Sequence, residues 1–288
     1  MEAQGKDTRT LEEALKETAQ RQWQGRRCYA TNLSQSKLAL MALYEAMGRV
    51  EGFGKPPRVC DVTAPTLRAA TSQWYAQGLA PATINKRLNC LSAMGVSVEG
   101  CRVREPKALK WWLKPEDEAR VLADLRGEHG ALGSLSVFIP WTTRTGLRVE
   151  ETLRLTRGDF SDGFRAVTVP GLKTSDAQAT LPLGVEASEL AQAVFAVASD
   201  APTARFIPHT YRELEDAWSK VRRVYGWRDN PTATLKALRR SAARHLHVTK
   251  GMPLDMVRQY LRHEDIETTM GYLRLTGGYG TEEMRRWL

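Results

Sequence analysis

The chain has 288 residues, 42% hydrophobic and 26% charged, a composition typical of a globular protein long enough for two domains and unlike disordered or collagen-like chains. Its formal net charge of +9 and pI near 9.5 favour a polyanionic partner such as nucleic acid, although a basic protein without such a partner would look the same. No apolar run approaches the ~18 residues of a membrane span, and the polar start MEAQGKDTRTLEE lacks the apolar core of a signal peptide, so we expect a cytoplasmic protein with no membrane partner.

Helical signals dominate residues 1–105. The segment Thr10-Leu-Glu-Glu13 is a capping-box pattern that opens a helix. Apolar periodicity, proline positions and glycine stops predict three more helices, at about 34–47, 63–75 and 81–94. The sequence therefore predicts a small all-α domain over residues 1–105.

The fourth predicted helix has a polar face. Its apolar positions should turn inward, which leaves other residues accessible, among them Thr83, Lys86 and Arg87. These three side chains can contact DNA phosphates, but a charged, solvated face is also an ordinary feature of helices. Both interpretations stay open at this point.

The stretch 98–115, VEGCRVREPKALKWWLKP, is basic and has no periodic apolar face. Such a stretch is typical of a linker between domains. Lys107 and Lys110 can follow a DNA backbone here, with Trp111 and Trp112 as packing anchors. The second domain is therefore expected over residues 106–288.

Helices are predicted in the second domain at about 115–125, 132–143, 188–198 and 211–225. Between them, residues 164–169 and 179–183 alternate with period two, which predicts a β-hairpin whose connection carries Lys173. Arg148 stands at the start of a short helix, where a cation is unfavourable with the helix dipole. This position indicates either a nearby anion or a pairing with Glu150 or Glu151.

The segment 235–275 concentrates the reactive side chains. Lys236 and Arg239 are three residues apart, so on a helix both can face one anion. His263 follows, and Tyr272 lies nine positions beyond it. A tyrosine held against a bound phosphate can attack it covalently. By themselves, His263 and Tyr272 would more often be packing residues.

Four segments in this order resemble the catalytic domain of the tyrosine recombinase (phage integrase) family: TGLRVEE, GLKTSDAQATLPL, LKALRR and LRHEDIETTMGY. The resemblance spans roughly residues 115–275, whereas residues 1–105 resemble the family's core-binding domain only in size, helicity and position. It implies a mainly α fold with a small antiparallel β-sheet in the catalytic domain, and a two-domain clamp around double-stranded DNA.

The resemblance also implies roles for individual residues. Tyr272 would be the nucleophile, Arg148 and Arg239 would clamp the phosphate, and Lys173 would protonate the leaving 5′ oxygen. Lys236 and His263 would assist proton transfer, and Glu151 would support the site from behind. No metal or other cofactor is expected. Two residues depart from the family pattern, since Lys236 stands where histidine is usual and Arg262 where glycine is usual.

The implied activity is site-specific recombination through a 3′-phosphotyrosyl intermediate, serving integration or excision of a phage or mobile element. The implied assembly is a homo-tetramer on two DNA sites, with accessory DNA-bending or directionality proteins, in the bacterial nucleoid or a phage-infected cell. Two alternatives stay open. A type IB-like topoisomerase would use the same residues without exchanging partners, and a non-catalytic DNA-binding regulator would keep only the basic surface.

Overall fold

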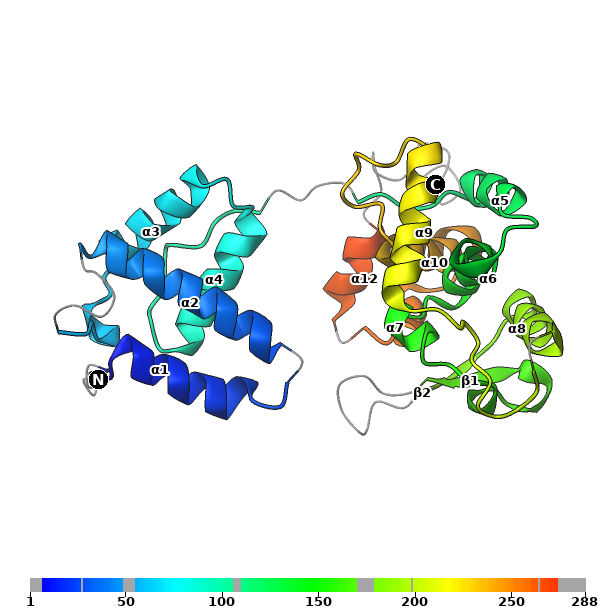
Figure 1. Cartoon of the computed structure of the whole chain (residues 1–288), viewed down its shortest axis with the longest axis horizontal. Helices are drawn as coiled ribbons and strands as arrows, with labels where there is room; N and C mark the ends of the chain where they lie inside the picture. The colour runs from blue at the N-terminus through cyan, green and yellow to red at the C-terminus, as the bar shows by residue number, and fades with distance from the viewer. Residues whose placement is uncertain are drawn as a thin grey trace. The chain divides into compact units, whose positions relative to one another are not determined.

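The polypeptide divides into two units, Met1–Lys107 and Ala108–Leu288, and each has a hydrophobic core of its own (Figure 1). The computed structural model describes residues 7–26, 28–48, 55–105, 110–169, 179–197, 199–263 and 265–273. The predicted class, mainly α with a small antiparallel sheet, is confirmed. None of the helices in these ranges is long and apolar enough to cross a membrane.

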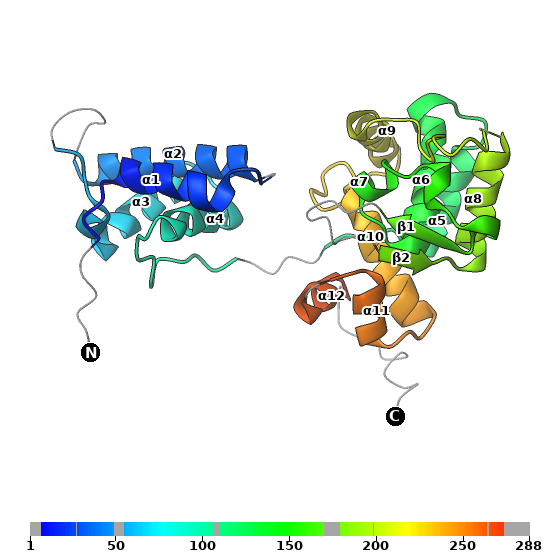
Figure 2. The ribbon, with the colours of Figure 1, turned by 90° about the horizontal axis from the view of Figure 1, so that it is seen from below.

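The first unit is all-helical in its described part. Its elements are α1 (Leu11–Thr18), a π-helical turn η1 (Ala19–Trp23), α2 (Tyr29–Ala46), a 3₁₀ turn η2 (Val59–Asp61), α3 (Ala64–Ala76) and α4 (Pro81–Ala93). The predicted capping box at Thr10 is present. Helix α2 packs against α3 and α4 around buried Leu43, Trp74 and Leu88 (Figure 2). The four predicted helices are thereby confirmed.

Helix α2 begins at Tyr29, five residues before its predicted start. Its first turns carry Asn32 and Ser36, which are residue types typical of loops. Both are buried, and the Ser36 hydroxyl donates to the carbonyl of Asn32 at 2.8 Å. A carbonyl of the same helix accepts from this hydroxyl, so the polar residue is tolerated inside the helix. The polar composition of residues 29–33 therefore led the sequence prediction to start the helix too late.

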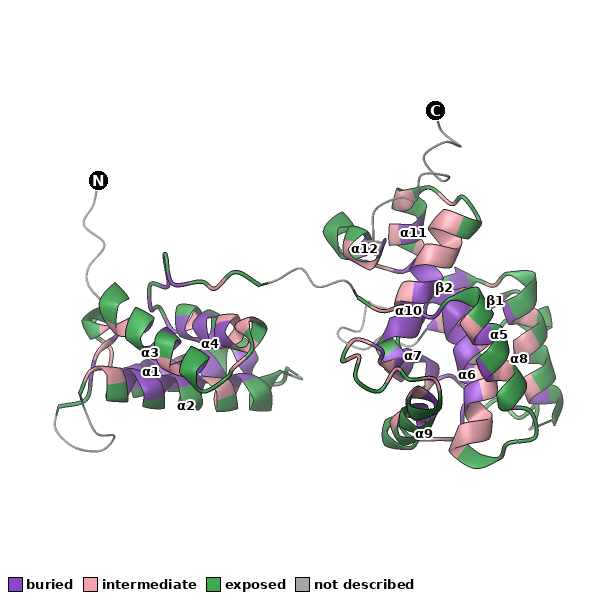
Figure 3. Ribbon diagram, turned by 90° about the horizontal axis from the view of Figure 1, so that it is seen from above, coloured by how far each residue is buried: buried purple, intermediate pink, exposed green. Residues whose placement is uncertain are grey.

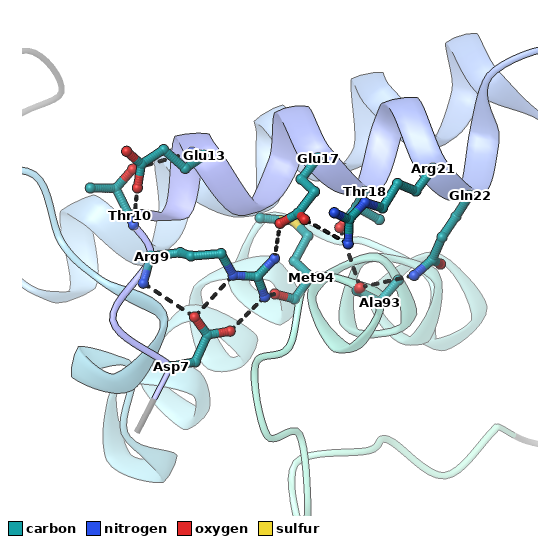
Figure 4. Close-up of polar contacts among 10 residues, drawn as sticks. All are labelled: Asp7, Arg9, Thr10, Glu13, Glu17, Thr18, Arg21, Gln22, Ala93 and Met94. Atoms are coloured by element: carbon teal, nitrogen blue, oxygen red, sulfur yellow. Dashed lines mark hydrogen bonds and ion pairs between the residues drawn. The ribbon is translucent and has the colours of Figure 1, made fainter. Parts of the chain in front are cut away.

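An ion-pair network fastens the start of the chain to the end of α4 (Figure 4). The Arg9 guanidinium contacts Asp7 at 2.5 Å, pairs with Glu17 of α1 and donates to the Met94 carbonyl at 3.5 Å. Thr18 of α1 donates to the Ala93 carbonyl at 3.3 Å. These contacts join α1 to the C-terminal end of α4, although the two elements are more than 60 residues apart in sequence.

The expected accessibility of Arg87 is wrong. Its side chain is only 8% exposed; Nε donates to Gln35 Oε1 at 3.2 Å, and the guanidinium lies over the Trp74 ring, 5.2 Å from the centroid. Burial lowers the pKa of this group. Arginine can be buried on a predominantly apolar face because its long stem packs and its planar head stacks on aromatic rings. Thr83 and Lys86 are partly exposed, as expected.

The predicted linker 98–115 is too long at both ends. Val98 and Cys101 are buried in the first core, and Asn85 exchanges hydrogen bonds with Val103 at 2.8 and 2.9 Å. At the other end, the Trp111 and Leu113 amides donate to side chains of the second unit. Both ends of the stretch therefore belong to the two units, and the linker is shorter than predicted. Hydrogen bonds of this kind leave no periodic pattern in the sequence. Lys110 is exposed, and Lys107 lies outside the described residues.

The second unit is built around α6 (Gly130–Thr145), which packs against α8 (Val185–Val197), α9 (Tyr211–Val224) and α10 (Leu235–Arg244). Buried residues line α6 and α10 in Figure 3. The remaining elements are α5 (Pro115–Asp124), α7 (Val149–Thr152), η3 (Arg157–Asp159), η4 (Asp162–Phe164), β1 (Ala166–Val169), β2 (Ala179–Pro182), η5 (His245–Thr249), α11 (Leu254–Tyr260) and α12 (Ile266–Leu273).

The predicted hairpin is present as an antiparallel pair, with Ala166 opposite Pro182 and Val169 opposite Ala179. Val167 and Val169 are buried, which agrees with the alternating pattern. The strand begins two residues later than predicted, because Phe164 belongs to the η4 turn and has a positive φ of 55°. Lys173, in the connection, lies outside the described residues.

Gly146 ends α6 in the left-handed conformation, with φ of 64°. A Cβ at this position would lie 2.3 Å from Leu261 Cδ2 and 3.4 Å from the Cβ of Ala242. Only glycine combines this backbone conformation with such close packing. Gly146 therefore determines how the α6–α7 junction meets α10 and the end of α11.

Replacing Gly146 with alanine should destabilise the protein by roughly 2–4 kcal/mol, since steric overlap adds to the left-handed penalty. Gly226→Ala is the matched control, because its φ is 70° but an added Cβ meets no described atom within 4 Å. The control should cost only about 1–2 kcal/mol. Urea unfolding of both variants measures the difference, and equal losses would contradict the steric explanation.

Candidate active site

Four segments of the second unit meet at one place. They are the start of α7, the middle of α10, the turn after α11, and α12. Helix α10 packs against both α6 and α12, and α11 packs against α12, as Figure 2 shows. The predicted residues Arg148, Arg239, His263 and Tyr272 come from these four segments. The fold therefore assembles side chains that are 124 positions apart in the sequence.

Arg148 caps the N-terminus of α7 and is paired with Glu151. The Arg148 amide donates to Glu151 Oε2 and its Nη1 donates to Oε1, both at 2.8 Å. Of the two explanations that the sequence left open, a nearby anion or a pairing with Glu150 or Glu151, the pairing with Glu151 is present. The Glu151 side chain is 3% exposed, whereas that of Arg148 is 47% exposed. Burial would raise the pKa of Glu151, but the Arg148 amide and the guanidinium groups of Arg262 and Arg148 outweigh it and lower the pKa.

Arg239 is almost entirely buried in α10, at 4% exposure. Its Nη1 donates to the carbonyl of Gly146 at 2.5 Å, and its Nη2 donates to the carbonyl of Leu261. Its Nε is buried and has no hydrogen-bond partner among the described residues. Burial, followed by repulsion from Arg148, lowers the pKa of Arg239 to about 10. The group stays charged at neutral pH, so the site holds a cation that protein groups satisfy only in part.

His263 is also buried, at 5% exposure, and its Nδ1 is 2.8 Å from Thr269 Oγ1. Its Nε2 is buried and lacks a hydrogen-bond partner within the described ranges. Burial and repulsion from Arg239, Arg148 and Arg262 lower the pKa of His263 to about 4. The imidazole is therefore neutral at physiological pH and can carry its proton on Nε2 when Thr269 donates to Nδ1.

Tyr272 stands on α12, beside His263. The two rings meet edge to face, with centroids 4.9 Å apart and an angle of 87° between planes. Tyr272 is half-buried and packs against a small cluster formed by Ala243, Val257, Leu261 and Leu273. Helix α12 begins at Ile266, so it supplies seven of the nine positions from His263 to Tyr272.

Lys236 and Arg239 share α10, but their surroundings differ. Lys236 is exposed, one residue into the helix, whereas Arg239 is buried one turn later. Both were predicted to face one anion. That Lys236 faces the same anion as Arg239 therefore stays a prediction, since its side chain is exposed and that of Arg239 is buried. Lys173 lies outside the described residues, and its place in the site stays a prediction.

Two residues at the site carried no functional prediction. Arg262 was noted only as a departure from the usual glycine, yet its Nη2 donates to Glu151 Oε2 at 2.6 Å. Thr269 orients His263, and its position three residues before Tyr272, on the same helical face, was an available signal. No group of three or more His, Cys, Asp or Glu side chains that could hold a metal ion occurs in the described part of the chain.

The arrangement suits the binding of a phosphate-like anion. Arg239 Nε and His263 Nε2 are buried polar atoms without partners among the described residues, and Arg148 adds an exposed guanidinium. Buried unsatisfied polar atoms are costly, so a ligand that satisfies them is strongly favoured. Tyr272 places a hydroxyl-bearing ring against His263.

Comparisons with known proteins agree with this geometry. A family model described as the phage integrase family matches residues 112–277. The chain is similar to the Tn1549 transposon integrase in complex with transposon right end DNA, at 16% identity and a TM-score of 0.72, covering 96% of this chain and 98% of that one.

Two further solved structures are similar. A lambda integrase dimer bound to a core site matches at 15% identity and a TM-score of 0.69, over 93% of this chain and 97% of that one. The XerH site-specific recombinase bound to palindromic difH substrate matches at 16% identity and a TM-score of 0.65, over 88% and 78%. At these identities the structural matches show a common fold. No curated protein sequence matches the chain.

The depressed pKa of His263 should make stability depend on pH. The unfolded imidazole gains a proton below pH ~6.5, whereas the folded one resists until about pH 4, so stability is lost as pH falls through this window. Between about pH 7.5 and pH 5 the loss from this residue should be about 2 kcal/mol. Urea unfolding of wild type and His263→Asn at both pH values isolates the contribution of His263 to the unfolding free energy. An identical pH dependence in the two proteins would refute the lowered pKa of His263.

Proposed function

The chain belongs to the phage integrase family of tyrosine recombinases, and we propose that it is a site-specific DNA recombinase that integrates or excises a phage or mobile element. The observation that carries the proposal is the convergence of Arg148, Arg239, His263 and Tyr272 around buried, unsatisfied donors. A phosphodiester has the charge and the oxygen acceptors that this site lacks.

In the proposed reaction, the Tyr272 hydroxyl oxygen attacks a DNA phosphorus and its proton passes to a solvent water. Arg148 and Arg239 hold the non-bridging oxygens, because phosphoryl transfer depends mostly on positioning and on neutralising their charge. The neutral His263 donates from Nε2 to the same phosphate while Thr269 occupies Nδ1. Lys236 adds positive charge from the solvent side.

The bond from phosphorus to the 5′ oxygen breaks as the new phosphotyrosyl bond forms. We propose that Lys173 gives its proton to the leaving oxygen, which yields a 3′-phosphotyrosyl link and a free 5′ hydroxyl. A 5′ hydroxyl from a partner strand then attacks the same phosphorus and gives its proton to the deprotonated Lys173. The bond from phosphorus to Tyr272 breaks, and the tyrosine oxygen regains a proton from water. The covalent link keeps the energy of the phosphodiester, so rejoining needs no ATP.

We propose that residues 1–105 form the core-binding domain and residues 106–288 the catalytic domain of a clamp around duplex DNA. Thr83, Lys86, Lys107 and Lys110 are the proposed backbone contacts. Arg87 is left out because it is buried. Support comes from the DNA complexes of the Tn1549 and lambda integrases, which share the fold.

The proposed assembly is a homo-tetramer on two DNA sites, since exchange needs four strand cleavages, and accessory DNA-bending or directionality proteins would set the direction. The proposed place of action is the cytoplasm, where the bacterial nucleoid or incoming phage DNA is found.

Tyr272→Phe should abolish the covalent adduct on DNA, because the attacking oxygen is gone. The binding site is selected from random duplexes, and a nicked duplex carrying it traps the intermediate, since the released fragment diffuses away. Tyr260→Phe is the matched control, because Tyr260 is a nearby tyrosine whose hydroxyl donates to the Pro182 carbonyl at 3.2 Å. An equal adduct yield with Tyr272→Phe would identify a different nucleophile.

Assays on duplexes that carry the selected site distinguish a recombinase from a topoisomerase and from a non-catalytic regulator. Wild type should produce recombinants from two duplexes that carry the site. Supercoil relaxation without any recombinant product would favour a type IB-like topoisomerase, and binding without an adduct would favour a regulator.

Lys236 should act mainly through its charge, because it is exposed. Lys236→Ala should lower the single-turnover cleavage rate roughly 10–100-fold, whereas Lys236→Arg should stay within about threefold of wild type. A Lys236→Arg variant as slow as Lys236→Ala would show instead that proton transfer is required, since arginine does not lose its proton at neutral pH.

A further inference from the structure

Arg262 occupies a backbone conformation that does not suit it. It joins α11 to His263 with φ of 55°, in the left-handed region. A residue other than glycine costs roughly 1–2 kcal/mol there, and asparagine is the side chain that tolerates it best. The turn itself would form more easily with glycine. The arginine side chain must therefore contribute something that compensates.

Arg262 contributes by pairing with the Glu151 carboxylate, which also pairs with Arg148. Its Oε1 accepts from Arg148 Nη1, and its Oε2 accepts from both the Arg148 amide and Arg262 Nη2. Two guanidinium groups thus flank one carboxylate that is 3% exposed. The Arg262 side chain is 19% exposed, and its Nε is buried without a partner among the described residues.

This sharing changes the charge available at the site. With Arg148 as the single cation beside it, the Glu151 carboxylate would form a neutral pair and hold that guanidinium close. Arg262 supplies a second positive charge, so the three groups together carry a net charge of +1. Arg262 also contributes to the lowered pKa of both Arg239 and His263, which places its charge within reach of the buried donors.

We propose that Arg262 is a positioning residue for phosphate binding: it shares the charge of Glu151, so that the exposed Arg148 guanidinium is held less strongly and can bind the phosphate while its Nη1 still contacts the carboxylate, and it keeps the site positively charged. The inference rests on the proposed function and deepens it. A purely structural role would be filled better by glycine, which adopts this turn without strain.

Arg262→Gly and Arg262→Asn both suit the left-handed turn and remove the cation, so they should fold. Each should lower the single-turnover cleavage rate on the nicked duplex roughly 10–100-fold at saturating DNA. The Kd for the duplex should change by less than about threefold, because most phosphate contacts lie elsewhere. Arg262→Lys should recover at least about tenfold of the loss, since it restores the charge.

Arg154→Gln is the matched control. It removes one exposed arginine in the turn just after α7 without touching the Glu151 carboxylate, and it should cleave at the wild-type rate. Thermal unfolding of all variants reports folding. If the variants fold and Arg262→Gly and Arg262→Asn cleave as fast as wild type, or if Arg262→Lys recovers nothing, the proposal is overturned while the proposed function stands.

A second measurement needs no DNA. NMR titration of the His263 imidazole reports the field of the charges that face it, which come from Arg148, Arg239 and Arg262, with Tyr272 packed against the ring. Arg262→Gly should raise the pKa of His263 from about 4 toward its ordinary value. An unchanged titration would overturn the inference. If instead wild type forms no adduct on DNA but the titration shifts, the proposed function fails and the charge coupling remains.

Discussion

The buried carboxylate of Glu151 is the interaction on which the site depends. It caps the first turn of α7, pairs with Arg148 and reaches Arg262 in the turn before His263. At 3% exposure the ionised form of the carboxylate is stable only among cations or hydrogen-bond donors, and removing one partner would leave a costly charge. Glu151 therefore joins a helix start near residue 148 to a turn more than 100 positions later.

A second link connects the same two regions through the backbone. Gly146 packs against Leu261, and the carbonyls of both residues accept from the Arg239 guanidinium. Arg239 is thus held in place by two chain segments that are themselves in contact. Arg239 Nε and His263 Nε2 are left without partners in the described structure. The backbone carbonyls fix the position of the Arg239 guanidinium. The donors that these carbonyls do not satisfy can bind an anion.

The cost of this arrangement explains why it indicates function. Burial, and then repulsion among the cationic groups, lower the pKa of Arg239 and keep His263 neutral. An anion stabilises cationic groups of this kind, as the Glu151 carboxylate does for Arg148 and Arg262, so the arrangement favours an anionic ligand. A preorganised cationic site of this kind stabilises the charge that develops on a phosphate during transfer.

Local sequence determined much of this protein. Period 3.6 and period 2 patterns located most helices and the hairpin, and the order of four short motifs identified the family and the residues that converge. Sequence could not place Arg87, because a charged residue on an apolar face looks solvated until Trp74 and Gln35 are found beside it. The linker ends, the depth of Arg239 and the pairing of Arg262 with Glu151 were decided only by tertiary structure. These features depend on contacts between distant segments, and no local periodicity records them.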